Sequence, residues 1–252
     1  MCSTFKMLAV AAVLKRIDEN KENLDRFVPY GDAQLLAYAP VTRAHVNEGG
    51  MKLGDLCGAA IEQSDNTAGN LLLEAIGGPA ELTRFARSIG DQFTRLDRVE
   101  PDLNDAVPGD ESDTTTPAAM CSDLQRLFTS DVLSTGSRER LENWMRHCET
   151  GTDTIRAGVS GDWQVSDKTG RSAKGAMNDV AVLRSPTAGP VFLSIFTFAP
   201  DKSTGSATKQ SLNWPERLFK PWATRSEPHW RLLIADWRVA IAEHRPRSGR
   251  ST

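Results

Sequence analysis

The stretch Met1-Cys2-Ser3-Thr4-Phe5-Lys6 opens the chain, and an apolar run over residues 8–17 comes directly after it. The period of this run predicts a buried helix. If the helix begins near Ser3, the three-residue spacing places the Ser3 hydroxyl beside the Lys6 amine in the first turn. A serine hydroxyl reacts only when a base accepts its proton, and a lysine that is neutral part of the time can do so. The pair is a candidate nucleophile and base, although a helix cap beside a surface lysine has the same spacing.

A second polar motif, Ser64-Asp65-Asn66, lies between two predicted helices at residues 53–61 and 67–76. Asp and Asn side chains bond to nearby backbone amides, which would fix a tight loop and aim Ser64 at a cleft. The same three residue types are also favoured as simple helix caps. Further helices are predicted at residues 81–89, 118–128 and 137–147.

The segment from Arg98 to Pro117 is polar, contains prolines and is too irregular for a long helix. It predicts a compact Ω-shaped loop. A buried Glu100 carboxylate in this loop could hold a water molecule with help from the Asn104 amide. The presence of Glu100 would therefore distinguish a hydrolase from a protein that is only acylated.

After residue 150 the hydrophobic period changes to that of strands. Strands are predicted at 163–170, 179–184 and 191–198, with a turn at 185–190, which together make an antiparallel meander. On the first strand, Lys168 supplies positive charge, Thr169 a hydroxyl, and Gly170 room for a ligand close to the backbone. A lysine and a threonine at a strand edge can also serve only to prevent aggregation.

Taken together, Ser3-x-x-Lys6, Ser64-Asp65-Asn66, the Glu100 loop and Lys168-Thr169-Gly170 resemble the class A serine β-lactamases in order and spacing. The resemblance runs from Met1 to about Pro200. It implies an α+β fold with an all-helical region (1–149), an antiparallel sheet region flanked by helices (150–200) and a cleft between them. Residues 201–252 would form an atypical C-terminal segment.

The resemblance also implies roles for these residues. Ser3 would attack a β-lactam carbonyl while Lys6, or Glu100 through water, accepts its proton, and the choice between these bases stays open. Backbone amides of Ser3 and Arg171 would stabilise the oxyanion. Glu100 and Asn104 would then direct water onto the acyl-enzyme.

The same resemblance implies further roles. Ser64 would relay a proton to the departing nitrogen, and Asp65 would be structural. Asn66 would bind the side-chain amide of the substrate. The strand edge Lys168-Thr169-Gly170 would bind the substrate carboxylate and orient the acyl group, with Arg171 as a substitute for the arginine that often supplements carboxylate binding in the family. The Arg98–Asp113 pair would clamp the neck of the Ω loop, against the alternative of a weak surface contact. Tyr38 would line the entrance to the cleft or be an ordinary half-buried tyrosine.

Composition restricts the function further. The 252 residues are 39% hydrophobic and 25% charged with a formal net charge of −3, which is typical of a globular protein and argues against nucleic-acid or membrane-surface partners. We find no membrane-spanning stretch, signal peptide, metal-ligand spacing or sign of an organic cofactor. The four cysteines show no disulfide spacing, so we expect free thiols. We expect a monomer, periplasmic or secreted by resemblance.

The two ends depart from the family pattern. The family carries a leader, a first helix and two strands before the nucleophile, whereas here the serine is the third residue. Residues 201–252 hold four of the six tryptophans, and the usual terminal helix is not recognisable there. Either a reading-frame change or fusion, or a replacement helix at residues 230–244, would account for this.

The sequence therefore predicts hydrolysis of the β-lactam amide through a serine acyl-enzyme, which confers antibiotic resistance. Two rival hypotheses remain open. A penicillin-binding DD-peptidase shares three of the motifs but lacks the Glu100 loop. A truncated, inactive relative would bind penicillins at most, without turnover.

Overall fold

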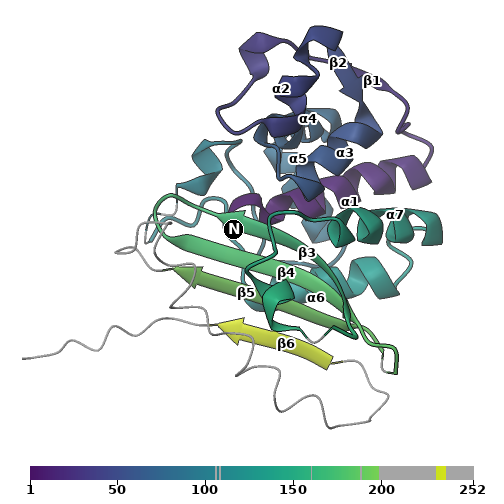
Figure 1. Ribbon diagram of the computed structural model, residues 1–252, viewed down its shortest axis with the longest axis vertical. Coiled ribbons are helices and arrows are strands. Elements are labelled where there is room, and N and C mark those ends of the chain that lie inside the picture. The colour runs from purple at the N-terminus through teal and green to yellow at the C-terminus, as the bar shows by residue number, and fades with distance from the viewer. Residues whose placement is uncertain (106, 108, 160, 188, 199–230, 237–252) are drawn as a thin grey trace, which may run out of the picture.

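A computed structural model of the chain describes all residues except 106, 108, 160, 188, 199–230 and 237–252 (Figure 1). The α-helices are α1 (Phe5–Asp18), α2 (Pro40–Ala44), α3 (Leu53–Glu62), α4 (Asn66–Ile76), α5 (Pro79–Ser88), α6 (Pro117–Thr129) and α7 (Thr135–Arg146). The strands are β1 (Phe27–Pro29), β2 (Gly50–Lys52), β3 (Gln164–Arg171), β4 (Ala176–Arg184), β5 (Val191–Phe198) and β6 (Arg231–Asp236). Short 3₁₀ turns are η1 (Cys2–Thr4), η2 (Asp32–Gln34), η3 (Val46–Glu48), η4 (Asp102–Asn104) and η5 (Ile155–Gly158).

Helix α1 is the centre of the helical region, and the prediction of a buried helix there is confirmed. Every residue from Phe5 to Leu14 is buried, so the helix is apolar all round rather than on one face. It contacts α3, α4, α5 and α7, which surround it (Figure 1). A polar group on this helix is consequently held in a fixed place and shielded from water, and Lys6 is such a group.

The predicted antiparallel meander is also confirmed. Strand β3 pairs with β4, and β4 with β5, with Lys168 opposite Val180 and Val180 opposite Ser194. Strand β4 begins at Ala176, three residues before the predicted start, because its first residues pair with the end of β3 and extend the hairpin to Arg171. The Lys-Thr-Gly motif therefore lies at the end of β3 that meets the helical region.

The sheet is buried on both faces. Val180 and Val182 of β4 belong to the large core shared with the helices, where α6 packs against β4 and β5. The alternate residues Ala181 and Leu183 belong to a second, smaller cluster with Ile155 of η5. This two-residue alternation follows from the pleat of a strand.

Two expectations need correction. The interpretation of residues 230–244 as a replacement helix is wrong for Arg231–Asp236, which form β6 and pair parallel to β5, with Val191 opposite Arg231. The apolar run there is short, and short apolar runs do not distinguish helix from strand. The region 1–149 is not purely helical either, because β1 and β2 form a small antiparallel ribbon within it. The remainder of residues 201–252 lies outside the described residues.

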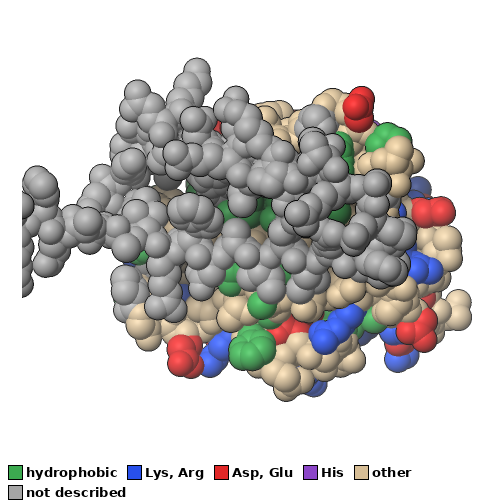
Figure 2. Space-filling model, turned by 90° about the horizontal axis from the view of Figure 1, so that it is seen from below, with side chains coloured by type: hydrophobic (Ala, Val, Ile, Leu, Met, Phe, Trp, Pro, Cys, Tyr) green, Lys and Arg blue, Asp and Glu red, His purple; other side chains and the backbone are tan. Residues whose placement is uncertain are grey.

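Viewed from the side of β6, hydrophobic side chains are visible toward the middle and charged ones toward the edge (Figure 2).

All four cysteines are buried free thiols, as expected. Within the part of the chain that the structure describes, no helix is both long and apolar enough to cross a bilayer.

Candidate active site

The structure brings together the first and third motifs. The Ser3 hydroxyl donates a hydrogen bond of 3.0 Å to Glu100 Oε1, although the two residues are 97 apart in sequence. Lys6 Nζ donates to Ser3 Oγ at 3.1 Å and lies 3.1 Å from the same Glu100 oxygen. Ser3 lies in η1 and Lys6 in the first turn of α1, as the spacing predicted. The hydroxyl therefore lies between an amine and a carboxylate, both inaccessible to solvent.

Lys6 is surrounded by acceptors. Besides Ser3, its amine donates to the Ser64 carbonyl at 2.8 Å and to Asn66 Oδ1 at 2.6 Å. Burial lowers the pKa of Lys6, and the charge of Glu100 acts in the opposite direction. The amine thus has three uncharged acceptors in addition to the Glu100 carboxylate. The Ser64 carbonyl and Asn66 Oδ1 can only accept hydrogen bonds, so these surroundings suit an ammonium with its three N–H donors.

Glu100 is held through both its side chain and its backbone. Asn104 Nδ2 donates to Oε2 at 2.5 Å, which leaves Oε1 for Ser3 and Lys6. Asn70 of α4 donates from Nδ2 to the Glu100 carbonyl and accepts from the Glu100 N–H, both at 2.9 Å. Sequence reasoning missed Asn70. Its only signal was its place one helical turn after Asn66, which puts it on the same face of α4.

The loop before α4 has a left-handed backbone at Ser64, with φ of +58°. Such a conformation is uncommon for a non-glycine residue and needs support from its surroundings. Asp65 gives that support, because its carboxylate accepts from the backbone amides of Val41, Thr42 and Ala68 at 2.9–3.0 Å. Asp65 thus caps α4 and also ties the loop to α2.

The sheet supplies the opposite wall. Lys168 Nζ donates to Ser64 Oγ at 2.9 Å and to the Thr169 carbonyl at 2.8 Å. Lys168 is fully buried and, among the described residues, has no ion pair, and burial lowers its pKa to about 8. A Cβ at Gly170 would lie 3.0 Å from the Ser3 nitrogen, so only glycine lets β3 approach η1 this closely.

The neck of the Ω loop is clamped. Arg98 Nε donates to Asp113 Oδ2 at 2.5 Å, and the backbone amides of Asp97 and Arg98 donate to Oδ1 at 2.8 and 2.9 Å. The Asp113 side chain is 1% exposed, so this contact differs from a solvent-screened surface pair. The predicted loop carries η4, and Glu100 precedes Pro101 through a cis peptide bond.

Two of the predicted site residues lie closer to the surface. Tyr38 is 51% exposed, and its hydroxyl donates to the Gln63 carbonyl at 3.1 Å. The Arg171 side chain forms an ion pair with Asp153 at 2.6 Å, so its charge already has a partner. Thr169 bonds to Thr150 between their hydroxyls at 2.5 Å. Thr150 was not predicted, because nothing in its local sequence marks it.

A groove of about 670 Å³ opens beside these residues, between the Ω loop and the β3–β4 turn. It is lined by Arg98, Pro101, Asp102, Asn104, Asp105, Arg171, Ser172, Ala173 and Lys174. Lys174 and Asp105 form an ion pair across it, and both are about half exposed. The groove reaches Asn104, the hydrogen-bond partner of Glu100.

A hydroxyl placed between an amine and a carboxylate, with a second hydroxyl–lysine pair beside it, is an arrangement suited to nucleophilic catalysis by a serine. Residues 1–212 match the model of the Beta-lactamase enzyme family. The chain is 50% identical over 189 residues to Beta-lactamase L2 of Stenotrophomonas maltophilia, a match that covers 75% of this chain and 62% of that protein. It is 44% identical over 202 residues to Beta-lactamase OXY-2 of Klebsiella oxytoca, covering 80% of this chain and 69% of that one.

Solved structures agree with these matches. A reconstructed last common ancestor of Gram-negative class A β-lactamases superposes with a TM-score of 0.80 and 52% identity, over 82% of this chain and 79% of that one. The putative class A enzyme PenP of Rhodopseudomonas palustris gives a TM-score of 0.80 and 48% identity, over 83% and 80% of the two chains. The chain therefore belongs to the β-lactamase enzyme family, and its α+β fold is the class A fold.

Proposed function

We propose that this chain hydrolyses the amide bond of β-lactam antibiotics through an acyl-enzyme on Ser3, and so confers resistance to them. The observation that carries the proposal is the direct contact of the Ser3 hydroxyl with both Lys6 and Glu100. A buried carboxylate that is hydrogen-bonded to the nucleophile distinguishes a hydrolase from a protein that is only acylated. The chain spans 62% of the length of L2, so the activity is inferred for the chain rather than transferred whole.

The acylation step starts with the Ser3 proton. Ser3 Oγ attacks the β-lactam carbonyl carbon while its proton passes to Glu100 Oε1, the oxygen it already contacts. Lys6 donates to Ser3 Oγ, so it stabilises the developing alkoxide instead of taking the proton. The geometry thus favours Glu100 over Lys6 as the base.

The oxyanion and the leaving nitrogen need donors. Gly170 lets β3 lie against η1, which supports the backbone amides of Ser3 and Arg171 as the oxyanion hole. When the C–N bond breaks, the nitrogen takes the proton of the Ser64 hydroxyl, which Lys168 holds in place from 2.9 Å. The proton that Glu100 accepted from Ser3 then replaces it by way of solvent, which restores the Glu100 carboxylate. The strained backbone at Ser64 aims this hydroxyl toward the cleft.

Hydrolysis completes the cycle. Glu100, again a carboxylate and held by Asn104 and by the backbone contacts of Asn70, accepts a proton from a water that attacks the Ser3 ester. The ester C–O bond breaks and Glu100 returns that proton to the Ser3 oxygen. The product is the ring-opened acid.

Recognition of the substrate is assigned to the sheet wall and to Asn66 at the start of α4. Lys168 and Thr169 would bind the carboxylate that β-lactams carry beside the ring nitrogen, and Asn66 the side-chain amide. Tyr38, exposed at the surface near this loop, would border the entrance. Arg171 contributes through its backbone, because Asp153 occupies its side chain. A monomer acting in the periplasm or outside the cell accords with this role.

The test is hydrolysis of a chromogenic cephalosporin by the 252-residue chain, with Ser3→Ala as the control. Many turnovers per protein molecule, lost in the control, would support the proposal. A single stoichiometric burst would point to a DD-peptidase-like protein. The absence of both acylation and turnover would point to an inactive relative.

A further inference from the structure

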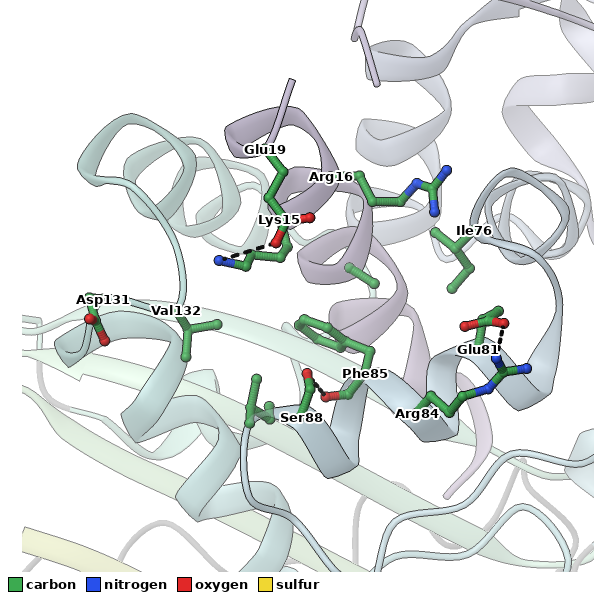
Figure 3. Close-up of a pocket in the computed structure, with 12 residues that line it drawn as sticks. Lys15, Arg16, Glu19, Ile76, Glu81, Arg84, Phe85, Ser88, Asp131 and Val132 are labelled. Atoms are coloured by element: carbon green, nitrogen blue, oxygen red, sulfur yellow. Dashed lines mark hydrogen bonds and ion pairs between the residues drawn. The ribbon is translucent and has the colours of Figure 1, made fainter. Parts of the chain in front are cut away.

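A second pocket lies at the far end of α1. It is bounded by the last turns of α1, the end of α4, helix α5 and the segment after α6 (Figure 3). Ten residues separate Lys6 from Arg16, so about 15 Å of helix lies between this pocket and the catalytic amine. None of its lining residues belongs to the candidate active site.

The floor of this pocket is apolar. Ala12, Ile76 and Ile89 are buried, and Phe85 and Val132 are partly buried against the same core. The Phe85 ring lies at the centre of the pocket in Figure 3. Such a surface gains free energy by covering an apolar or aromatic body.

The charged side chains on its walls differ in whether they have ion-pair partners. Lys15 pairs with Glu19 at 3.5 Å, and Arg84 with Glu81 at 2.6 Å. Arg16 has no hydrogen bond or ion pair from its side chain to any described residue, and it acts on the charge of Glu22 from a distance; its Nε is buried. In Figure 3 its guanidinium points away from the Lys15–Glu19 pair, toward the side of Ile76. The residue is only partly buried, so the terminal N–H groups of the guanidinium, which have no partner among the described residues, are the donors that an anionic ligand would meet.

We propose that this pocket binds a small monocarboxylate with an aromatic or otherwise apolar body, seated on Phe85 with its carboxylate on Arg16. The planar guanidinium fork matches a carboxylate with two parallel hydrogen bonds. The volume of about 560 Å³ is in the usual range for small-molecule pockets. Asp131 lies on the opposite wall without a described partner, so it repels a second negative charge and favours a singly charged ligand.

The experiment is calorimetric titration with 2-naphthoate and with its neutral amide, 2-naphthamide, which has the same ring system without the charge. Three proteins are compared: the unaltered chain, Arg16→Met and Lys15→Met. Lys15→Met is the matched control, because it removes a neighbouring cation that already has a partner. We expect saturable binding of naphthoate to the unaltered chain and to Lys15→Met, and at least tenfold weaker binding to Arg16→Met. Naphthamide should bind all three equally weakly.

Turnover of the chromogenic cephalosporin by Arg16→Met reports whether that variant is folded; should it fail, Arg16→Gln provides the same comparison. The proposal is overturned if naphthoate does not bind the unaltered chain, or binds Arg16→Met as tightly. Equal binding of naphthoate and naphthamide would also overturn it. If the unaltered chain does not turn over the cephalosporin, the proposed hydrolase function is contradicted, but the naphthoate titration still tests the second pocket.

Discussion

Two buried lysines, one on each wall of the cleft, differ in their partners. Lys6, on the helical wall, lies 3.1 Å from the carboxylate of Glu100, and both side chains are fully inaccessible. Lys168, on the sheet wall, has only a hydroxyl and a carbonyl as partners and forms no ion pair with any described residue. Burial lowers the pKa of both.

The difference suggests a division of labour. The charge of Lys6 is neutralised by the Glu100 carboxylate. Lys6 can therefore stabilise the proton transfer from Ser3 without needing the charge of a ligand. Lys168 has no ion-pair partner among the described residues, although Asp167 and Asp179 act on its charge from a distance, and the carboxylate of an incoming substrate would complete the pair. The same residue type thus serves chemistry on one wall and binding on the other, according to whether a carboxylate already lies beside it.

The largest effect is expected from Glu100→Gln, which removes the base but keeps the shape of the side chain. Turnover should fall by about 10²–10⁴-fold, the usual contribution of general acid–base catalysis. If acylation retains some rate, a covalent adduct on Ser3 should accumulate, visible as a mass increase. An unchanged turnover rate would remove Glu100 from the mechanism.

The free energy of unfolding of two variants tests the same difference between the lysines. Lys6→Met leaves the Glu100 carboxylate buried without its counter-charge, and losing one partner of a buried pair costs about 3–5 kcal/mol. Lys168→Met removes two hydrogen bonds, but it also removes a buried charge without an ionic partner, whose desolvation cost offsets much of that loss. We therefore expect a net loss of under about 2 kcal/mol. Urea unfolding of the two variants measures both values. Equal losses would mean that the two lysines do not differ as described.

Lys168→Met should nevertheless weaken substrate recognition. A hydrogen bond to a charged group contributes about 1.5–3 kcal/mol, so kcat/KM for a carboxylate-bearing penicillin should fall about 10- to 150-fold. The methyl ester of the same penicillin is the control, because it has no negative charge. A similar loss with the ester would assign Lys168 to chemistry rather than to binding the carboxylate.

The pH dependence sharpens the same point. The Lys168 pKa of about 8 means that the ammonium predominates at pH 7 and the neutral amine at pH 9. Binding of a carboxylate needs the ammonium, so KM should rise about tenfold between these pH values. In Lys168→Arg the guanidinium stays charged, and the rise should disappear. A KM that is flat in the unaltered chain would contradict the assignment.

The smallest effect is expected at the Asp105–Lys174 ion pair across the groove. This pair has the same chemistry as Lys6–Glu100, but both its side chains are about half exposed. Exposed pairs contribute at most about 1 kcal/mol, so Lys174→Ala should change kcat/KM by less than about fivefold. Raising the salt concentration should reduce even that change. A much larger effect would indicate that the pair controls access to the groove.

Much of the fold could be predicted from the sequence, because the relevant signals are local. The continuous apolar run of α1 predicted a buried helix, and the change of hydrophobic period after residue 150 predicted strands. The strand at Arg231–Asp236 was missed, because its pairing with β5 crosses a long stretch of chain and leaves no local pattern. Short apolar runs take their conformation from the partners that they find.

For the site, the sequence by itself determined the residue types and their order: a serine and a lysine one turn apart, a capping aspartate, a loop glutamate and a strand lysine. Only the tertiary structure decided which of them meet. It placed Glu100 on the Ser3 hydroxyl, Asn70 on the Glu100 backbone, and Asp153 on the Arg171 side chain. The physical reason is that helical spacing fixes neighbours within one turn, whereas contacts between residues about a hundred positions apart depend on how whole elements pack.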